Sequence, residues 1–247
     1  HLTINGGVST VYVLTTNNLS TAGQVTITNS ELNLNGLTFN MGDNVGSDAI
    51  NIFGTLNVNQ GAFLKMGKAA SLTVNSGGTV KIVGTSGNVA TVTKQAAGTT
   101  YAFTVSAGGN ISAQYYLFEY MNIGGIVVNS GANINATDNF RNGTFSNGFA
   151  GGKFLVLQNN FTPYIANGVI FNNGPTYAIS RTSGTGDITF NDATGPLASY
   201  LYEQDDNAPT TGLVRWTYTN PQLIWIGVTS TDWQDPTNWS TTGPPGP

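Results

Sequence analysis

The strongest constraint on the fold is a short pattern that recurs along the chain. Apolar and polar residues alternate, then Asn or Ser, any residue and Gly follow, and an apolar residue comes three positions after the Gly. The four clear copies are Leu56–Gly61, Leu72–Gly77, Phe103–Gly108 and Ile126–Gly131. Their Gly residues are 16, 31 and 23 residues apart, so the repeat is irregular. Val25–Ser30 has the same alternation without the Gly.

A period of two indicates half-buried strands, and Asn/Ser-x-Gly indicates a tight turn that needs left-handed backbone angles. One such unit cannot bury its apolar face, whereas copies stacked about 4.8 Å apart form a continuous core. The pattern therefore predicts an all-β parallel β-helix (solenoid). At roughly 20 to 25 residues per coil, residues 10–219 give about nine irregular coils. The turn residues would stack as a polar ladder made of Asn59, Asn75, Ser106 and Asn129.

Composition excludes several functions. Only 8% of the 247 residues are charged, the net charge is −4, and the eight Lys and Arg are scattered. With no basic stripe to neutralise phosphates, neither nucleic acid nor an anionic membrane is an expected partner. No apolar run is long enough for membrane insertion. The absence of Cys excludes a disulfide framework and thiolate metal sites.

Several segments resemble the right-handed parallel β-helix regions of large secreted or surface proteins of Bacteroidetes-type bacteria. They are the coil pattern, Phe118–Gly125, Gly186–Asp206 and Val214–Trp216. The resemblance implies a secreted or cell-surface location and a monomer linked to other domains. It makes residues 1–219 the parallel β-helix, and residues 220–247 a C-terminal extension, a cap or the truncated start of a following β module. Trp216, Trp225, Trp233 and Trp239 are expected to cap or pack there.

This fold includes pectate lyases, polygalacturonases, carbohydrate-binding β-helix modules and adhesin stalks, so it does not choose the function. The polygalacturonase series of Asp, Gly-His and Arg-x-Lys motifs is incomplete here, because its His and basic tripeptide are missing. Among the twelve acids, Asp205-Asp206 is the only adjacent pair. Glu119 is the acid to suspect first, because it lies inside an expected strand. No organic cofactor is expected; the acids Asp43, Asp48, Asp205 and Asp206 are the candidate oxygen ligands for calcium.

Carbohydrate recognition needs aromatic rings for pyranose faces and short polar side chains for hydroxyl groups. Aromatic residues crowd the expected strand around Tyr115–Tyr120, and alternation prevents all of them from pointing inward. The candidate binding residues are Tyr115, Tyr116, Glu119, Tyr120, Tyr164 and Tyr177.

The leading hypothesis is a non-catalytic carbohydrate-binding module for a plant or other neutral polysaccharide, with a xylan-like glycan as the first guess. The alternative is an adhesin or structural spacer segment of a cell-surface protein. A third reading is a β-helix polysaccharide lyase or glycoside hydrolase whose acids meet only in three dimensions.

Overall fold

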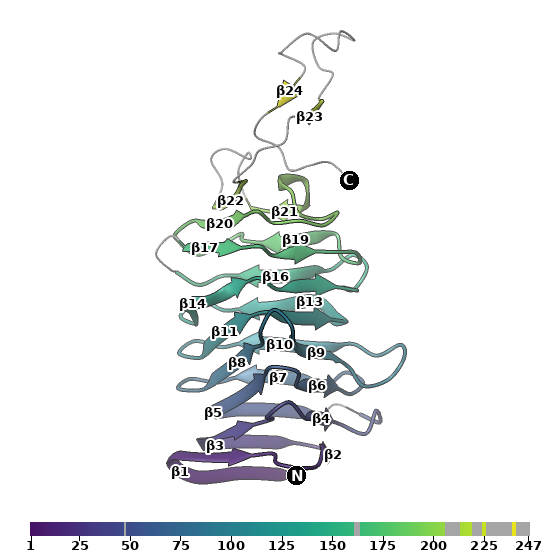
Figure 1. Ribbon diagram of the computed structural model, residues 1–247, viewed down its shortest axis with the longest axis vertical. Coiled ribbons are helices and arrows are strands. Elements are labelled where there is room, and N and C mark those ends of the chain that lie inside the picture. The colour runs from purple at the N-terminus through teal and green to yellow at the C-terminus, as the bar shows by residue number, and fades with distance from the viewer. Residues whose placement is uncertain (47, 161–163, 206–212, 219–223, 226–238, 241–247) are drawn as a thin grey trace.

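The computed structural model describes residues 1–46, 48–160, 164–205, 213–218, 224–225 and 239–240. Its strands stack as a parallel β-solenoid of about eight turns (Figure 1). The all-β parallel solenoid predicted from the repeat is confirmed, and the number of turns is close to the expected nine. Within residues 220–247 the structure describes two short antiparallel strands, β23 (Ile224–Trp225) and β24 (Trp239–Ser240). The rest of the predicted C-terminal extension, including Trp233, lies outside the described residues.

Each turn contributes strands to three faces. The first face contains the N-terminal halves of β1 (Leu2–Val13), β3 (Val25–Asn33) and β5 (Ala49–Asn59), then β7 (Ser71–Val74), β10 (Tyr101–Val105), β13 (Met121–Val128), β16 (Lys153–Leu157), β19 (Tyr177–Ser180) and β21 (Glu203–Gln204). The second contains the C-terminal halves of β1, β3 and β5, then β8 (Thr79–Val83), β11 (Asn110–Gln114), β14 (Asn133–Arg141), β17 (Tyr164–Asn167), β20 (Ile188–Asn191) and β22 (Val214–Thr217). The third contains β2 (Leu19–Thr21), β4 (Thr38–Met41), β6 (Phe63–Met66), β9 (Ala90–Lys94), β12 (Tyr116–Glu119), β15 (Thr144–Ser146) and β18 (Ile170–Phe171). A short 3-10 helix, η1 (Tyr200–Tyr202), precedes β21.

Tight turns join the first face to the second, and they stack on one another. The nitrogen of Gly77 donates to the carbonyl of Gly108 at 2.9 Å, and the nitrogen of Gly108 donates to the carbonyl of Gly131 at 2.8 Å. All three glycines have φ between 74° and 78°, a conformation that costs other residues strain. The Asn/Ser-x-Gly repeat therefore sets both the corner and the register of these turns.

Alternation places one side of every strand in a continuous core. Phe118, Phe145 and Phe171 come from successive turns of the third face and stack inside it. Their ring centroids are 5.6 Å apart between Phe118 and Phe145, and 5.4 Å apart between Phe145 and Phe171, with an interplanar angle of only 5° in the second pair. The core continues through Phe190 to Trp216, whose rings are stacked 5.1 Å apart. Trp216 in β22 thus packs against Phe171 and Phe190 of the preceding turns, whereas the side chains of Trp225 and Trp239 lie outside the described residues.

Arg181 is a buried charge that the sequence did not suggest. It follows β19 and is 0% exposed. Its guanidinium donates to four main-chain carbonyl groups, those of Leu157, Asn159, Thr185 and Gly186, at 2.8 to 3.3 Å. Because these carbonyls belong to two successive turns, Arg181 ties the loop before β20 to the turn beneath it. Buried charged groups are tolerated when their donors are satisfied in this way.

Candidate functional site

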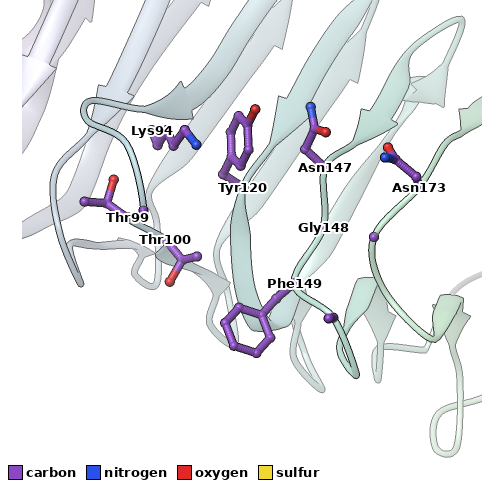
Figure 2. A pocket seen from close by; sticks show the side chains of 11 residues that line it. Lys94, Thr99, Thr100, Tyr120, Asn147, Gly148, Phe149 and Asn173 are labelled. Carbon is purple, nitrogen blue, oxygen red and sulfur yellow. The ribbon is translucent and has the colours of Figure 1, made fainter.

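An open groove of about 340 Å³ lies at the corner where the third face turns into the first. Figure 2 shows that its side chains come from several turns of the solenoid. We call it the Tyr120 groove, and its lining residues are Lys94, Gly98, Thr99, Thr100, Tyr120, Asn147, Gly148, Phe149, Ala150, Asn173 and Gly174.

Lys94, Tyr120, Asn147 and Asn173 form a row along this groove (Figure 2). Lys94 ends β9, and the other three follow β12, β15 and β18. The main chains of the corner are joined, because the nitrogen of Tyr120 donates to the carbonyl of Asn147 and the nitrogen of Gly148 donates to that of Asn173, both at 3.2 Å. Parallel register therefore brings one residue from each of four turns to one line.

Tyr120 occupies a left-handed corner conformation with φ of 59°, which takes its ring out of the strand alternation. The ammonium nitrogen of Lys94 lies 3.5 Å from the centre of the Tyr120 ring. This is a close cation–π contact, which holds the lysine and the ring against each other. Both side chains are half-buried, so each keeps surface for a further contact.

Glu119 lies beside the groove on the outer side of β12, and its carboxylate fixes a row of neutral donors. The Oγ1 of Thr93 donates to Oε2 at 3.1 Å, and the Nδ2 of Asn147 donates to Oε1 at 3.0 Å. Because a carboxylate can only accept, the nitrogen end of the Asn147 amide must face Glu119. Oδ1 of Asn147 is then the amide end that can accept a hydrogen bond from another molecule.

The far wall of the groove is Phe149, an aromatic ring that is 44% exposed. Gly148 and Gly174 also line the groove, and their backbones pack directly together. A Cβ on Gly174 would collide with the carbonyl oxygen and the nitrogen of Gly148, and Gly174 has φ of 127°. A Cβ on Gly148 would meet Pro175 at 2.6 Å and Phe154 at 2.7 Å. Close backbone approach at these two glycines therefore gives the groove its shape.

A second groove, of about 320 Å³, lies at the corner between the first and second faces near the N-terminal turns. Phe53, which is 46% exposed, is its aromatic residue, and Glu31 is its one acid. Gly54 lies at the bend of β5, where a Cβ would collide with the carbonyl of Ser30. This groove has a single ring, whereas the Tyr120 groove has two rings and two amides.

The structure separates the aromatic residues that the sequence grouped together. Tyr116 is 1% exposed, its hydroxyl donates to the carbonyl of Phe140 at 2.9 Å, and its ring packs 4.7 Å from that of Phe118. Tyr116 is a core residue, because it points to the same side of the strand as Phe118. It is therefore no longer a candidate for binding a ligand at the surface. Tyr115 is half-buried at the preceding corner with φ of 47°, outside the lining of the Tyr120 groove.

Two other candidates come from later turns. Tyr177 begins β19, is half-buried and pairs with Lys153 on the first face, also outside the groove lining. Tyr164 begins β17, and its side chain lies outside the described residues. Of the six predicted binding residues, the structure therefore brings Tyr120 and Glu119 together at one place.

The acids predicted to hold calcium already serve the main chain where they are described. Asp43 Oδ1 accepts from the nitrogen of Val45 at 2.8 Å, and Asp48 Oδ2 accepts from the nitrogen of Asp43 at 3.2 Å. Asp205 Oδ2 accepts from the nitrogen of Val214 at 3.2 Å, and Asp206 lies outside the described residues. Within the described part of the chain, no three His, Cys, Asp or Glu side chains gather to hold a metal. Calcium binding stays a prediction.

The predicted turn ladder divides between two corners. Asn75, Ser106 and Asn129 follow β7, β10 and β13, whose last residues are in register, and each nitrogen donates to the strand of the turn below at 2.8 to 2.9 Å. Asn59 ends the second half of β5, and its Nδ2 donates to Oδ1 of Asn33 at 2.9 Å. The sequence around Asn59 matches that around the other three residues. However, β5 continues from the first face into the second, so Asn59 lies at the corner after the second face and not in the same ladder.

Sequence reasoning missed Lys94, Asn147, Phe149 and Asn173. A weak signal for the row exists in three segments that share an inward Phe followed by a polar residue and then Tyr or Asn. They are Leu117–Tyr120, Thr144–Asn147 and Ile170–Asn173. The Gly-based repeat marks a different corner of the solenoid, and therefore it does not predict this row.

A glycosidase site needs a pair of carboxylates, and neither groove is lined by such a pair. Among the acids that the structure describes, Glu203, near the last described turn, has a clearly shifted pKa. Burial raises the pKa of Glu203 to about 7, while a hydrogen bond from Nε1 of Trp216 lowers it and the charge of Asp205 raises it. Burial also raises the pKa of Tyr101, and the charge of Glu119 adds to this effect. The Tyr101 hydroxyl donates to the carbonyl of Val92 in the core.

Comparison of the chain with family models, curated proteins and solved structures gives no match. No helix in the described part of the structure is long and apolar enough to cross a membrane. The function therefore has to be argued from the grooves themselves.

Proposed function

We propose that this solenoid is a non-catalytic carbohydrate-binding module and that the Tyr120 groove is its binding site. The observation that carries the proposal is the combination of two accessible rings and two amide side chains in one open groove. Tyr120 and Phe149 offer apolar faces, and Asn147 and Asn173 offer donors and acceptors. Sugars present the complementary surfaces, since pyranose rings have apolar faces and hydroxyl edges.

The groove suits a chain rather than a compact small molecule. It is open and shallow, and its row of polar residues follows the long axis across four turns that are about 4.8 Å apart. A linear polysaccharide running along this line would contact successive turns. A xylan-like glycan is the first polymer to test, and the proposal places the module in a secreted or cell-surface protein.

A structural spacer is the second candidate. The observation that favours it is the continuous aromatic core from Phe118 through Phe145 and Phe171 to Phe190, which makes the later turns a packed rod. A spacer needs this stiffness but no groove with accessible rings. Binding of a glycan at the Tyr120 groove separates the two candidates.

Affinity electrophoresis through gels that contain xylan, pectin, β-glucan or mannan tests the proposal. At least one polymer should retard the chain, and Phe149→Ala should abolish most of that retardation. Phe53→Ala is the matched control, because Phe53 is equally exposed but lies in the other groove. Tyr120→Asn is a second variant, since Asn tolerates the left-handed corner and occurs there in the next turn, where Asn147 has φ of 51°.

Lack of retardation by every polymer would remove the proposal and leave the spacer. Loss of binding in Phe53→Ala with normal binding in Phe149→Ala would move the site to the second groove. Release of reducing sugar or unsaturated ends from a polymer would instead indicate a lyase or hydrolase, and Glu119→Gln would be the first variant to examine.

A further inference from the structure

The Tyr120 groove contains one charged group, the ammonium of Lys94, because its other lining residues are neutral at pH 7. In the described part of the chain the ion pairs are Lys81 with Glu31 and Arg215 with Asp187, so Lys94 belongs to neither. The contact that the structure gives this ammonium is the Tyr120 ring. An ammonium has three N–H donors, and a ring face satisfies them poorly compared with an anion.

Glu119, the acid beside this corner, forms no ion pair with Lys94 in the described part of the chain. Both carboxylate oxygens of Glu119 accept from neutral side chains, those of Thr93 and Asn147. The contact with Tyr120 holds Lys94 over the groove. The arrangement is therefore a positioned cation beside an oriented acceptor, Oδ1 of Asn147, and an apolar ring.

We propose that the groove selects a glycan with an anionic sugar residue, either a uronate or a sulfated sugar, whose anion pairs with Lys94. This inference rests on the proposed carbohydrate-binding function and deepens it. The sugar bearing the anion would lie at Lys94 and Tyr120, and neighbouring neutral sugars would lie at Asn147, Asn173 and Phe149. It revises the expectation of a wholly neutral polysaccharide.

The charge of the protein narrows the ligand further. The chain has a net charge of −4, and the groove offers a single cation. A uniformly charged polyanion would gain one ion pair and meet general repulsion from the rest of the molecule. A neutral chain with isolated anionic substituents gains the same ion pair with little repulsion. We therefore assign the groove to a sparsely charged glycan.

Titration calorimetry with matched oligosaccharides tests the inference. The probes are a xylo-oligosaccharide that carries one glucuronate and its carboxyl-reduced form, and a singly sulfated galacto-oligosaccharide and its desulfated form. One anionic probe should bind about tenfold more tightly than its neutral partner, the usual effect of a charge-assisted hydrogen bond. The preference should shrink as salt is raised, because an accessible ion pair is screened.

Variants locate the effect. Lys94→Gln should abolish the preference for the anionic probe over its neutral partner, whereas Lys94→Arg should keep that preference. Lys65→Gln is the matched control, since Lys65 contacts the ring of Phe63 on the same face but lies outside the groove. The two probe pairs distinguish a carboxylate ligand from a sulfate ligand.

Equal binding of anionic and neutral probes would overturn the inference while leaving the proposed function intact. A preference that survives in Lys94→Gln would also overturn it, because the anion would then bind elsewhere. Failure of all four probes would overturn it too, and the polymer gels would show separately whether the chain binds carbohydrate at all. Tighter binding of polygalacturonate than of the singly charged probes would contradict the assignment to a sparsely charged glycan.

Discussion

Burial controls the ionisation of Glu203, a side chain near the last described turn that also accepts a hydrogen bond from Trp216. Its pKa rises from the ordinary 4.5 to about 7, so the folded protein holds this proton more tightly than the unfolded chain does. The resulting stabilisation is complete below pH 4.5 and is lost as pH rises through about 7.

Thermal unfolding at pH 5 and pH 8 measures this effect. The melting temperature of the unmodified chain should be lower at pH 8 than at pH 5. Glu203→Gln should reduce this decrease by about 2 °C, because the amide still accepts a hydrogen bond from Trp216 but carries no titrating charge. Asp138→Asn, a change to an acid of the distant strand β14, should leave this fall in melting temperature unchanged. An identical pH dependence in the unmodified chain and in Glu203→Gln would contradict the raised pKa.

Among the elements, the third face depends most on matched aromatic residues. Phe145 lies between Phe118 and Phe171 in the stack and is fully buried. Phe145→Ala should lower the free energy of unfolding by about 3 to 5 kcal/mol, because it leaves a cavity in a stack that cannot collapse. Phe149→Ala, four residues later at an exposed ring, should change it by about 0.5 kcal/mol or less. Urea unfolding curves measure the change in the free energy of unfolding for both variants. Similar decreases in the two variants would show that burial in the stack does not determine how much stability is lost.

The strands themselves could be predicted from the sequence, whereas their corners could not. Alternation identified the inward residues of β7, β10 and β13, because burial on one face of a strand requires a period of two. The same rule placed Asn59 at the wrong corner, because β5 bends from the first face into the second without any interruption of the alternating pattern. It also left the position of Tyr120 open, since only a left-handed corner releases a ring from the alternation, and Tyr is not a typical residue there.

At the scale of the whole molecule, the groove could not be predicted from the sequence, because its residues come from separate turns. Tyr120, Asn147 and Asn173 become neighbours only when successive coils are placed in register, and the Gly-based repeat, with steps of 16, 31 and 23 residues, does not specify that register. Lys94 joins them from a fourth coil. The solenoid could be predicted from local repeats, but the site depends on their alignment, which an irregular repeat does not specify.

The same stacking makes the stability of the rod local, since each turn contacts only the turns beside it. Phe145→Ala should therefore speed amide hydrogen exchange about tenfold or more in β15 and its neighbours β12 and β18. Strands β4 and β6, several turns away, should keep the rates of the unmodified chain because no contact transmits the cavity to them. Mass spectrometry of exchanged peptides measures each region separately. Equal acceleration in β4, β6 and β15 would show instead that the turns unfold as one cooperative unit, with the aromatic stack coupling the rod from end to end.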